Sequence, residues 1–140
     1  MSDVSIREAR AADEPALRQL IAEAIGEADA GIDPVAPGPS GDVVFVAELF
    51  GHPAGYAAVR VEGAVLVADR VVVAPADRGL RVGNRLLDWL EGYGISRGLR
   101  RVRIAVEPGN RAAHEFYGRR GYASCAGAVE RDLPAPVDEP

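Results

Sequence analysis

The sequence predicts one α/β domain with a mixed, mostly antiparallel central sheet of six to seven strands and helices on both faces of the sheet. Three observations lead to this fold class. Short β-branched runs joined by turns containing Gly and Pro occupy residues 43–73. Apolar residues recur with helical spacing before these runs, at 16–25, and after them, at 82–95. A length of 140 residues corresponds to a single domain.

The first half of the chain is expected to hold a strand, a helix and a three-stranded meander. Residues 4–7 alternate as a first strand, and Asp13-Glu14-Pro15 supplies the acidic residues and the proline that favour a helix start. The segment 26–41, rich in Gly, Pro and Asp, is predicted to be a loop. The meander follows, with strands at 43–50, 56–61 and 64–73 and turns at 51–55 and 62–63.

The second half is expected to alternate helices and strands. The helix predicted at 82–95 is weakened by Gly92 and Gly94. The domain is expected to cover residues 1–132, followed by a flexible tail at 133–140 that contains three prolines. The remaining predicted elements are a strand at 101–106, a helix at 111–119 and a last strand near 123–130.

Composition and charge exclude several classes of function. No apolar run approaches membrane-spanning length and the N-terminus lacks a signal-peptide pattern, so a cytoplasmic protein that does not bind membranes is expected. The single cysteine, Cys125, excludes an internal disulfide and is expected to be a small core or strand residue. The two histidines show no metal-ligand spacing, and no metal site is predicted. The net charge of −5 argues against nucleic-acid binding.

The charge is divided unevenly along the chain. Residues 1–69 carry twelve acidic residues and four arginines, whereas residues 70–140 carry nine acidic residues and twelve arginines. An anionic cofactor held by the second half and a cationic amine approaching the first half would fit this division. A chance distribution of solvated surface charge would fit it equally well.

A strand, a loop containing glycines and a helix make residues 69–95 a candidate anion site. The β-branched run Val71-Val72-Val73 ends before Pro75, and the loop carries Arg78, Gly79 and Gly83. Glycines allow close approach of a ligand, and the first N–H groups of the helix favour phosphate. An ordinary connection between strand and helix has the same pattern. The sequences of a P-loop and of a dinucleotide fingerprint are absent.

A second motif lies about thirty residues further on. Residues 110–122 predict a short helix with Asn110 as its N-cap and Gly121 as its stop. Together the two stretches resemble the GNAT acetyltransferase superfamily over roughly residues 4–129. Arg78-Gly79-Leu80-Arg81-Val82-Gly83 resembles that family's Arg/Gln-x-x-Gly-x-Gly/Ala loop, and residues 110–122 resemble its Asn-x-x-Ala-x-x-Phe-Tyr-x-x-x-Gly-Phe segment, with Tyr122 in place of Phe.

The resemblance implies that acetyl-CoA is a co-substrate and indicates which residues bind it. The loop would hold the pyrophosphate, and backbone groups of the strand at 71–73 would pair with the pantetheine arm as an added strand. Arg81 stands where the motif has its first glycine, so its side chain would crowd the pyrophosphate or add a cation to it. The implied cofactor-binding residues are Val71, Val72, Val73, Arg78, Gly79, Leu80, Arg81, Val82, Gly83, Asn84, Asn110 and Tyr117.

The same resemblance implies that Tyr117 is the general acid. A phenol with a reference pKa of about 10 can protonate a departing thiolate whose conjugate acid has a pKa near 8.5. Periodicity alone favours a core aromatic beside Phe116, and it is the match to the family motif that reverses this preference. Asp69, Glu48 and Glu107 are candidate general bases, and a chain of waters is the alternative. His114 is expected to face solvent. The nucleotide side and an exposed helix face explain equally well the arginines Arg111, Arg119 and Arg120.

The sequence therefore favours an acetyl-CoA-dependent N-acetyltransferase that acts on a primary amine by direct attack. The alternative is a non-catalytic module with the same fold, which would bind acyl-CoA or have a regulatory role. Its motivation is Arg81, which stands at the position of a motif glycine. An interaction domain that binds no cofactor is a third class. The acidic first half favours a small cationic acceptor, and the resemblance makes a homodimer an expectation.

Overall fold

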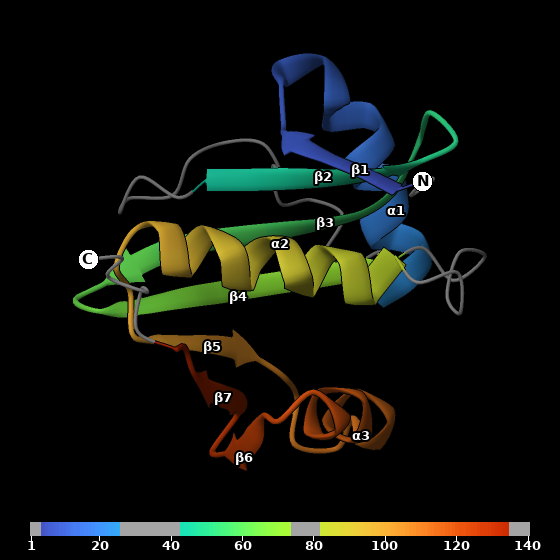
Figure 1. Cartoon of the computed structure of the whole chain (residues 1–140). Coiled ribbons are helices and arrows are strands. Elements are labelled where there is room, and N and C mark those ends of the chain that lie inside the picture. The colour runs from blue at the N-terminus through green and yellow to red at the C-terminus, as the bar shows by residue number, and fades with distance from the viewer. Residues whose placement is uncertain (1–3, 26–42, 74–81, 135–140) are drawn as a thin grey trace.

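The computed structural model describes residues 4–25, 43–73 and 82–134, and Figure 1 shows the whole chain. In chain order the described elements are β1 (Val4–Glu8), a 3-10 turn η1 (Ala11–Asp13), α1 (Glu14–Ile25), β2 (Val43–Leu49), β3 (His52–Glu62), β4 (Val65–Val73), α2 (Val82–Ser96), β5 (Arg101–Ala105), α3 (Arg111–Arg119), β6 (Ala123–Cys125) and β7 (Ala128–Asp132).

The strands form one seven-stranded sheet in the order β1-β2-β3-β4-β5-β7-β6. Only the pairing of β4 with β5 is parallel, because α2 crosses between them, and the other described pairs are antiparallel. The predicted fold class, a mixed and mostly antiparallel sheet with helices on both faces, is therefore confirmed.

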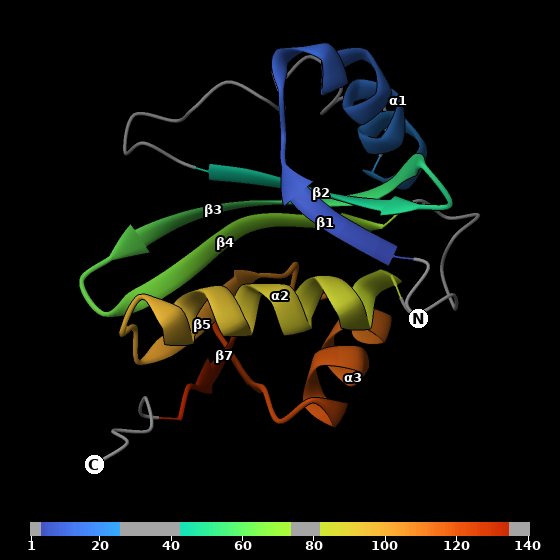
Figure 2. The same cartoon turned by 45° about the horizontal axis from the view of Figure 1, so that its top comes forward.

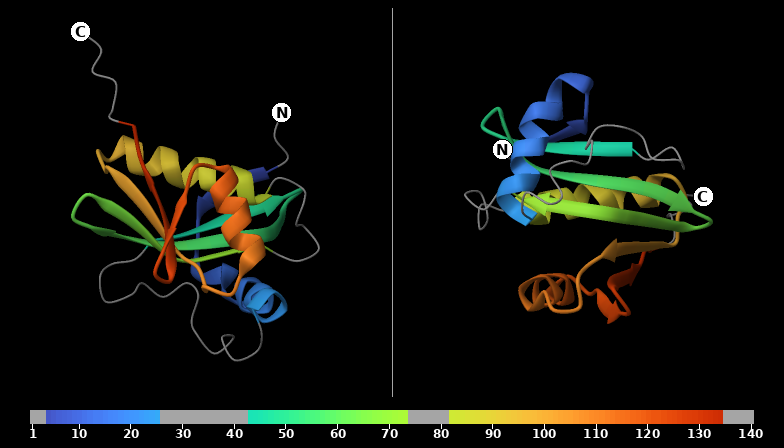
Figure 3. Two further views of the ribbon diagram at one scale, coloured as in Figure 1. Left: turned by 90° about the horizontal axis from the view of Figure 1, so that it is seen from below. Right: turned by 180° about the vertical axis from the view of Figure 1, so that it is seen from behind.

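The helices divide between the two faces of the sheet (Figures 2 and 3). Leu17 and Leu20 of α1 pack on one face in a small cluster with residues of β2, β3 and β4. The α2 residues Leu86 and Leu90 pack on the opposite face, together with Tyr117 of α3, in the larger cluster. The amphipathic pattern at 82–95 thus correctly predicts a helix with one buried side.

The turn between β2 and β3 is shorter than predicted. The expected turn at 51–55 is wrong, since β3 begins at His52, opposite Leu49, and only Phe50 and Gly51 connect the strands. Both residues have positive φ, at 50° and 83° respectively, as a two-residue hairpin turn requires. Because phenylalanine is unfavourable in that conformation, the residue types predicted a turn at the glycines and the proline that follow Phe50.

The C-terminal part is a hairpin and not the single strand predicted near 123–130. Ala126 and Gly127 separate β6 from β7, and Gly127 has a φ of 69°. Leu133, where the expected tail begins, is buried, and its N–H donates to the Arg100 carbonyl at 2.8 Å. Cys125 lies in β6 as a strand residue and is exposed.

Candidate active site

A β-bulge at Asp69 shapes β4, the strand that leads to the predicted cofactor loop. Ala58 of β3 pairs with Arg70 and Val59 pairs with Ala68, which leaves Asp69 as an extra residue on β4. Such a residue reverses the alternation of side chains along the strand. Accordingly Ala68 faces the α2 cluster before the bulge, whereas Val71 and Val73 face that cluster after it.

Beyond the bulge, β4 loses its second neighbour. The parallel ladder with β5 ends where Ala68 meets Ile104, and β5 itself ends at Ala105. Val71–Val73 pair with β3, but among the described residues they have no strand partner on the side of β5. Figure 1 shows β5 turning away from β4 towards α3. The backbone of Val71–Val73 therefore presents an open edge that can take an extended ligand as an added strand.

The start of α2 and the middle of α3 meet beside this open edge. Val82 is buried in the core, and Gly83 lies in the first turn of the helix. A Cβ atom at Gly83 would lie 3.4 Å from the Phe116 ring and 3.8 Å from the Val73 side chain, so the first turn of α2 lies beside both α3 and the end of β4. The predicted loop residues Arg78, Gly79, Leu80 and Arg81 lie outside the described residues.

The helix α3 begins and ends as the sequence predicts. Its N-cap is Asn110, whose Oδ1 accepts a hydrogen bond from the Ala113 N–H at 3.2 Å. Its last residue is Arg119, and Gly121 follows with a φ of 90°, a conformation that favours glycine. Local signals at both ends thus fix the position of Tyr117 within the helix.

Tyr117 is buried between two other aromatic rings. Its ring centroid lies 5.2 Å from that of Phe116 and 5.6 Å from that of Tyr122. Burial raises the pKa of Tyr117 to about 12, so the phenol keeps its proton at neutral pH. Its hydroxyl has no hydrogen bond to a described residue. The side chain can therefore act both as a core aromatic and as a proton donor.

The three candidate bases differ in their ion pairs. Glu48 accepts a hydrogen bond from Arg7 at 2.9 Å, and Asp69 accepts one from Arg60 at 2.8 Å. Glu107 is exposed and has no ion pair with a described residue. Glu107 is thus the most available of the three carboxylates.

His114 is half-buried and hydrogen-bonded, so the expectation that it faces solvent is only partly met. Its Nδ1 lies 2.9 Å from Ser124 Oγ, and its Nε2 lies 3.0 Å from the Glu107 carbonyl oxygen. These three residues join α3 to β6 and to the loop after β5. A shallow pocket beside them is lined by Pro108, His114, Ser124, Cys125, Ala126 and Gly127. No sequence pattern indicated this contact, because Ser124 comes from the following hairpin.

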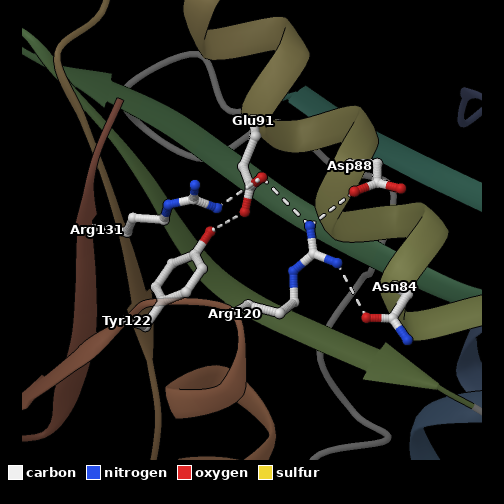
Figure 4. Close-up of polar contacts among 6 residues, drawn as sticks. All are labelled: Asn84, Asp88, Glu91, Arg120, Tyr122 and Arg131. Atoms are coloured by element: carbon white, nitrogen blue, oxygen red, sulfur yellow. Dashed lines mark hydrogen bonds and ion pairs between the residues drawn. The ribbon is translucent and has the colours of Figure 1, made fainter. Parts of the chain in front are cut away.

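Asn84, an expected cofactor-binding residue, and Arg120 contact each other. The Arg120 guanidinium donates to Asn84 Oδ1 at 2.9 Å and to Asp88 at 2.7 Å, both on α2 (Figure 4). Arg111 and Arg119 are exposed on α3. The structure therefore brings Val73, Val82, Gly83 and Tyr117 into one region, with the Asn84 side chain directed to Arg120.

Fold and site together define an α/β protein whose sheet opens beside a buried tyrosine. A model of the Acetyltransferase (GNAT) family matches residues 7–122. The chain therefore belongs to the GNAT acetyltransferase family. No curated protein sequence matches it.

Similar solved structures share this fold. The PaiA N-acetyltransferase from Thermoplasma acidophilum, in complex with coenzyme A, has a TM-score of 0.78 at 17% identity and covers 95% of this chain and 100% of its own. The ribosomal-protein-S18-alanine N-acetyltransferase from Escherichia coli has a TM-score of 0.74 at 19% identity and covers 97% of this chain and 96% of its own. Nourseothricin acetyltransferase has a TM-score of 0.73 at 23% identity, with coverage of 96% and 100%.

None of the described helices is both long and apolar enough to cross a membrane. No group of three His, Cys, Asp or Glu side chains that could hold a metal ion occurs among the described residues.

Proposed function

We propose that this protein is an N-acetyltransferase that moves the acetyl group of acetyl-CoA to a primary amine. The observation that carries the proposal is the open backbone edge of Val71–Val73, which lies next to the first turn of α2 and to α3. An extended pantetheine arm suits that edge, and the N-terminal end of a helix suits a pyrophosphate. The membership of the GNAT family supports the choice of an acyl-CoA cofactor.

The proposed reaction needs no covalent enzyme intermediate. The amine nitrogen attacks the thioester carbon, and the carbonyl oxygen becomes an oxyanion that a backbone N–H of Val71–Val73 stabilises. Collapse of this intermediate breaks the carbon–sulfur bond. Tyr117 then gives its proton to the departing thiolate, which a phenol protonated at neutral pH can do.

Deprotonation of the amine is assigned to Glu107 or to a water that Glu107 holds. A free alkylamine is mostly protonated at neutral pH, so a base must take a proton before the attack. The carboxylates of Glu48 and Asp69 already accept hydrogen bonds from Arg7 and Arg60, whereas Glu107 is exposed and has no ion pair with a described residue, so Glu107 is chosen over both. The nitrogen loses a second proton when the amide forms, and this proton restores the Tyr117 phenol, whose own proton is now on the thiol of coenzyme A. The reaction releases one proton in total, the one first taken from the ammonium group.

We propose a small cationic molecule as the acceptor. The acidic first half of the chain would attract such an amine. The fold itself does not select an acceptor, since the similar structures include enzymes named for a ribosomal-protein alanine and for nourseothricin.

The first test compares the native chain with Tyr117→Phe. Calorimetric titration should show that both bind acetyl-CoA with similar affinity, because the substitution removes only a hydroxyl. A screen of amines that reports released thiol should show turnover reduced about 100-fold or more in the variant, the usual effect of losing a general acid. Tyr93→Phe is the matched control, because Tyr93 lies in α2 and packs against Phe45.

Two outcomes would contradict the proposal. Binding of acetyl-CoA without thiol release for any amine would favour the non-catalytic acyl-CoA module. Absence of binding, with binding restored in Arg81→Gly, would mean that Arg81 closes the loop to the cofactor and that the native chain is not this enzyme.

A further inference from the structure

Glu91 in α2 is the centre of a polar network that joins three parts of the molecule (Figure 4). Its carboxylate accepts a hydrogen bond from the Tyr122 hydroxyl at 2.7 Å, from Arg120 at 3.2 Å and from Arg131 at 3.3 Å. Tyr122 and Arg120 follow α3, and Arg131 belongs to β7. One side chain of α2 thus holds the end of α3 and the strand beside it.

The network is buried enough to be rigid. The Glu91 side chain is 13% exposed and that of Arg120 is 17% exposed. A carboxylate removed from water is costly unless it is paired and hydrogen-bonded, so the three donors hold Glu91 in one position. Arg120 and Arg131 compensate its charge, and the Tyr122 hydroxyl occupies its second oxygen.

One arm of the network reaches Tyr117. The Tyr122 ring lies 5.6 Å from the Tyr117 ring, and the Tyr122 N–H donates to the Tyr117 carbonyl oxygen at 3.0 Å. The hydrogen bond from the Tyr122 hydroxyl to Glu91 therefore holds in place one of the rings that pack against Tyr117. The family motif has Phe at this position, so the hydroxyl that makes the contact is a feature of this chain.

The other arm reaches the start of α2. Arg120 donates to Asn84 and Asp88, which lie in the first two turns of that helix. The same guanidinium donates to Glu91, one turn further on. The network thus connects the helix end proposed to bind the pyrophosphate with the helix that carries the proposed acid.

We propose that Glu91 and Tyr122 are positioning residues that hold Tyr117 in register with the start of α2. This inference rests on the proposed function, since it assigns the two residues an effect that acts through the Tyr117 hydroxyl. A purely structural network would stabilise the fold without acting on that hydroxyl.

A double-mutant cycle separates the two roles. Tyr122→Phe in the native background should lower kcat about 10-fold with little change in the KM for acetyl-CoA, because small misplacements of a catalytic group cost rate rather than binding. In the Tyr117→Phe background the same substitution should have almost no effect on kcat, since the hydroxyl that it positions is gone. An equal loss of kcat in both backgrounds would overturn the proposal.

The matched control is Glu130→Gln. Glu130 also pairs with two arginines, Arg103 at 2.7 Å and Arg101 at 3.9 Å, but it joins β5 to β7 and has no contact with α2 or α3 in this network. This variant should change kcat by less than the substitutions in the network. A loss equal to that of Tyr122→Phe would also contradict the proposal.

A spectroscopic measurement tests the inference without the acceptor. The chain has four tyrosines, so fluorotyrosine-labelled protein gives four fluorine signals, and Tyr117→Phe identifies one of them. We expect Glu91→Gln to shift or broaden the Tyr117 signal and Glu130→Gln to leave it in place. A Tyr117 signal unchanged by both Glu91→Gln and Tyr122→Phe would overturn the inference.

Failure of the proposed function is distinguishable from failure of this inference. If Tyr117→Phe itself leaves kcat unchanged, Tyr117 is not the general acid, and the positioning role of Glu91 and Tyr122 falls with it. If Tyr117→Phe lowers kcat but the network substitutions do not, the acid stands and the positioning role falls. If Glu91→Gln does not fold, Tyr122→Phe alone carries both measurements, because it keeps the buried charges paired.

Discussion

Burial has two effects at Tyr117. It packs the ring between Phe116 and Tyr122, and it raises the pKa of the phenol to about 12. The proton that the proposed chemistry needs is therefore held by the environment of the ring and does not depend on a specific partner. This also makes the folded state sensitive to alkali, since only the protonated form fits the site.

We expect Tyr117 to destabilise the protein at high pH. Because its folded-state pKa lies above the ordinary value of 10, its stabilisation is complete below pH 10 and is lost as the pH rises towards 12. Urea unfolding at several pH values between 8 and 11.5 should show a smaller alkaline loss in Tyr117→Phe, which cannot ionise at that position. An identical alkaline loss in both proteins would contradict this expectation.

Two glycines in α2, Gly92 and Gly94, lie in opposite environments. Gly92 is exposed, with no described atom within 4 Å of an added Cβ. Gly94 is buried, and a Cβ there would lie 2.7 Å from Leu133 Cδ1. The sequence presents both as weak points of the helix, whereas the structure shows that Gly94 makes room for the residue after β7.

We therefore expect Gly92→Ala and Gly94→Ala to differ in sign. Gly92→Ala should raise the free energy of unfolding by about 0.5–1 kcal/mol, the usual gain in a helix interior. Gly94→Ala should lower it by about 1 kcal/mol, because the buried Leu133 side chain must shift to make room for the added methyl group. Thermal and urea unfolding of the two variants measure these changes in the free energy of unfolding. When Gly94→Ala is introduced into Leu133→Ala, it should no longer lower the free energy of unfolding. Equal stabilisation by both alanines would show that Leu133 adapts without cost.

At the scale of elements, Arg7 ties the first strand to its neighbours. Its guanidinium donates two hydrogen bonds to Asp13, both at 2.8 Å, and one to Glu48 of β2 at 2.9 Å. Asp13 also accepts a hydrogen bond from the Arg10 N–H at 2.7 Å. These contacts fix the direction in which the chain leaves β1 and enters α1.

The stabilisation by the contacts between Arg7 and Asp13 should be lost in acid. The hydrogen bonds from Arg7 lower the pKa of Asp13 from 3.8 to about 2, so the folded state favours the ionised carboxylate. The stabilisation is therefore present above pH 4 and disappears as the pH falls through 2. At pH 7, Asp13→Ala should cost about 2 kcal/mol of unfolding free energy, the usual value for hydrogen bonds to a charged group. Below pH 2 the variant and the native chain should unfold alike, and a persistent difference there would contradict the assignment.

Elements with local signals were the ones that the sequence could predict. The bounds of α3 follow from Asn110 and Gly121, and those of α2 from its apolar spacing. The bulge at Asp69 has no such signal, because it depends on how β3 pairs with β4 across the turn at Gly63. The Phe50-Gly51 turn was missed because its first residue is one that rarely adopts a positive φ.

The candidate site was predictable only where a motif carries it. Tyr117 and Gly83 were found because they lie in two recognisable stretches, and the structure brings both stretches together. The network around Glu91 was not found, because its members come from α2, the end of α3 and β7 and share no spacing along the chain. Such contacts follow from packing and not from any local preference.

For the molecule as a whole, the central sheet consists of two parts that share one short ladder. Strands β1 to β4 are joined by antiparallel pairing, and β5, β7 and β6 form the second antiparallel part. Only four residue pairs, from Val65–Arg101 to Ala68–Ile104, connect β4 with β5. The helix α2 also bridges the two parts, since it contacts both β1–β4 and β5, and the Glu91 network links it to Arg131 of β7 (Figure 4).

The divergence of β4 and β5 has a consequence for amide protons. In a strand, successive N–H groups point to opposite edges, so the amides of Val71–Val73 alternate between the β3 side and the open side. Among the described residues, the amides on the open side have no ladder partner in β5, so we expect them to exchange with water without any opening of the sheet. We expect their neighbours bonded to β3 to exchange only when the strands separate. Exchange along this segment should therefore alternate between fast and slow, and a ligand lying on the open edge would make all of these amides slow.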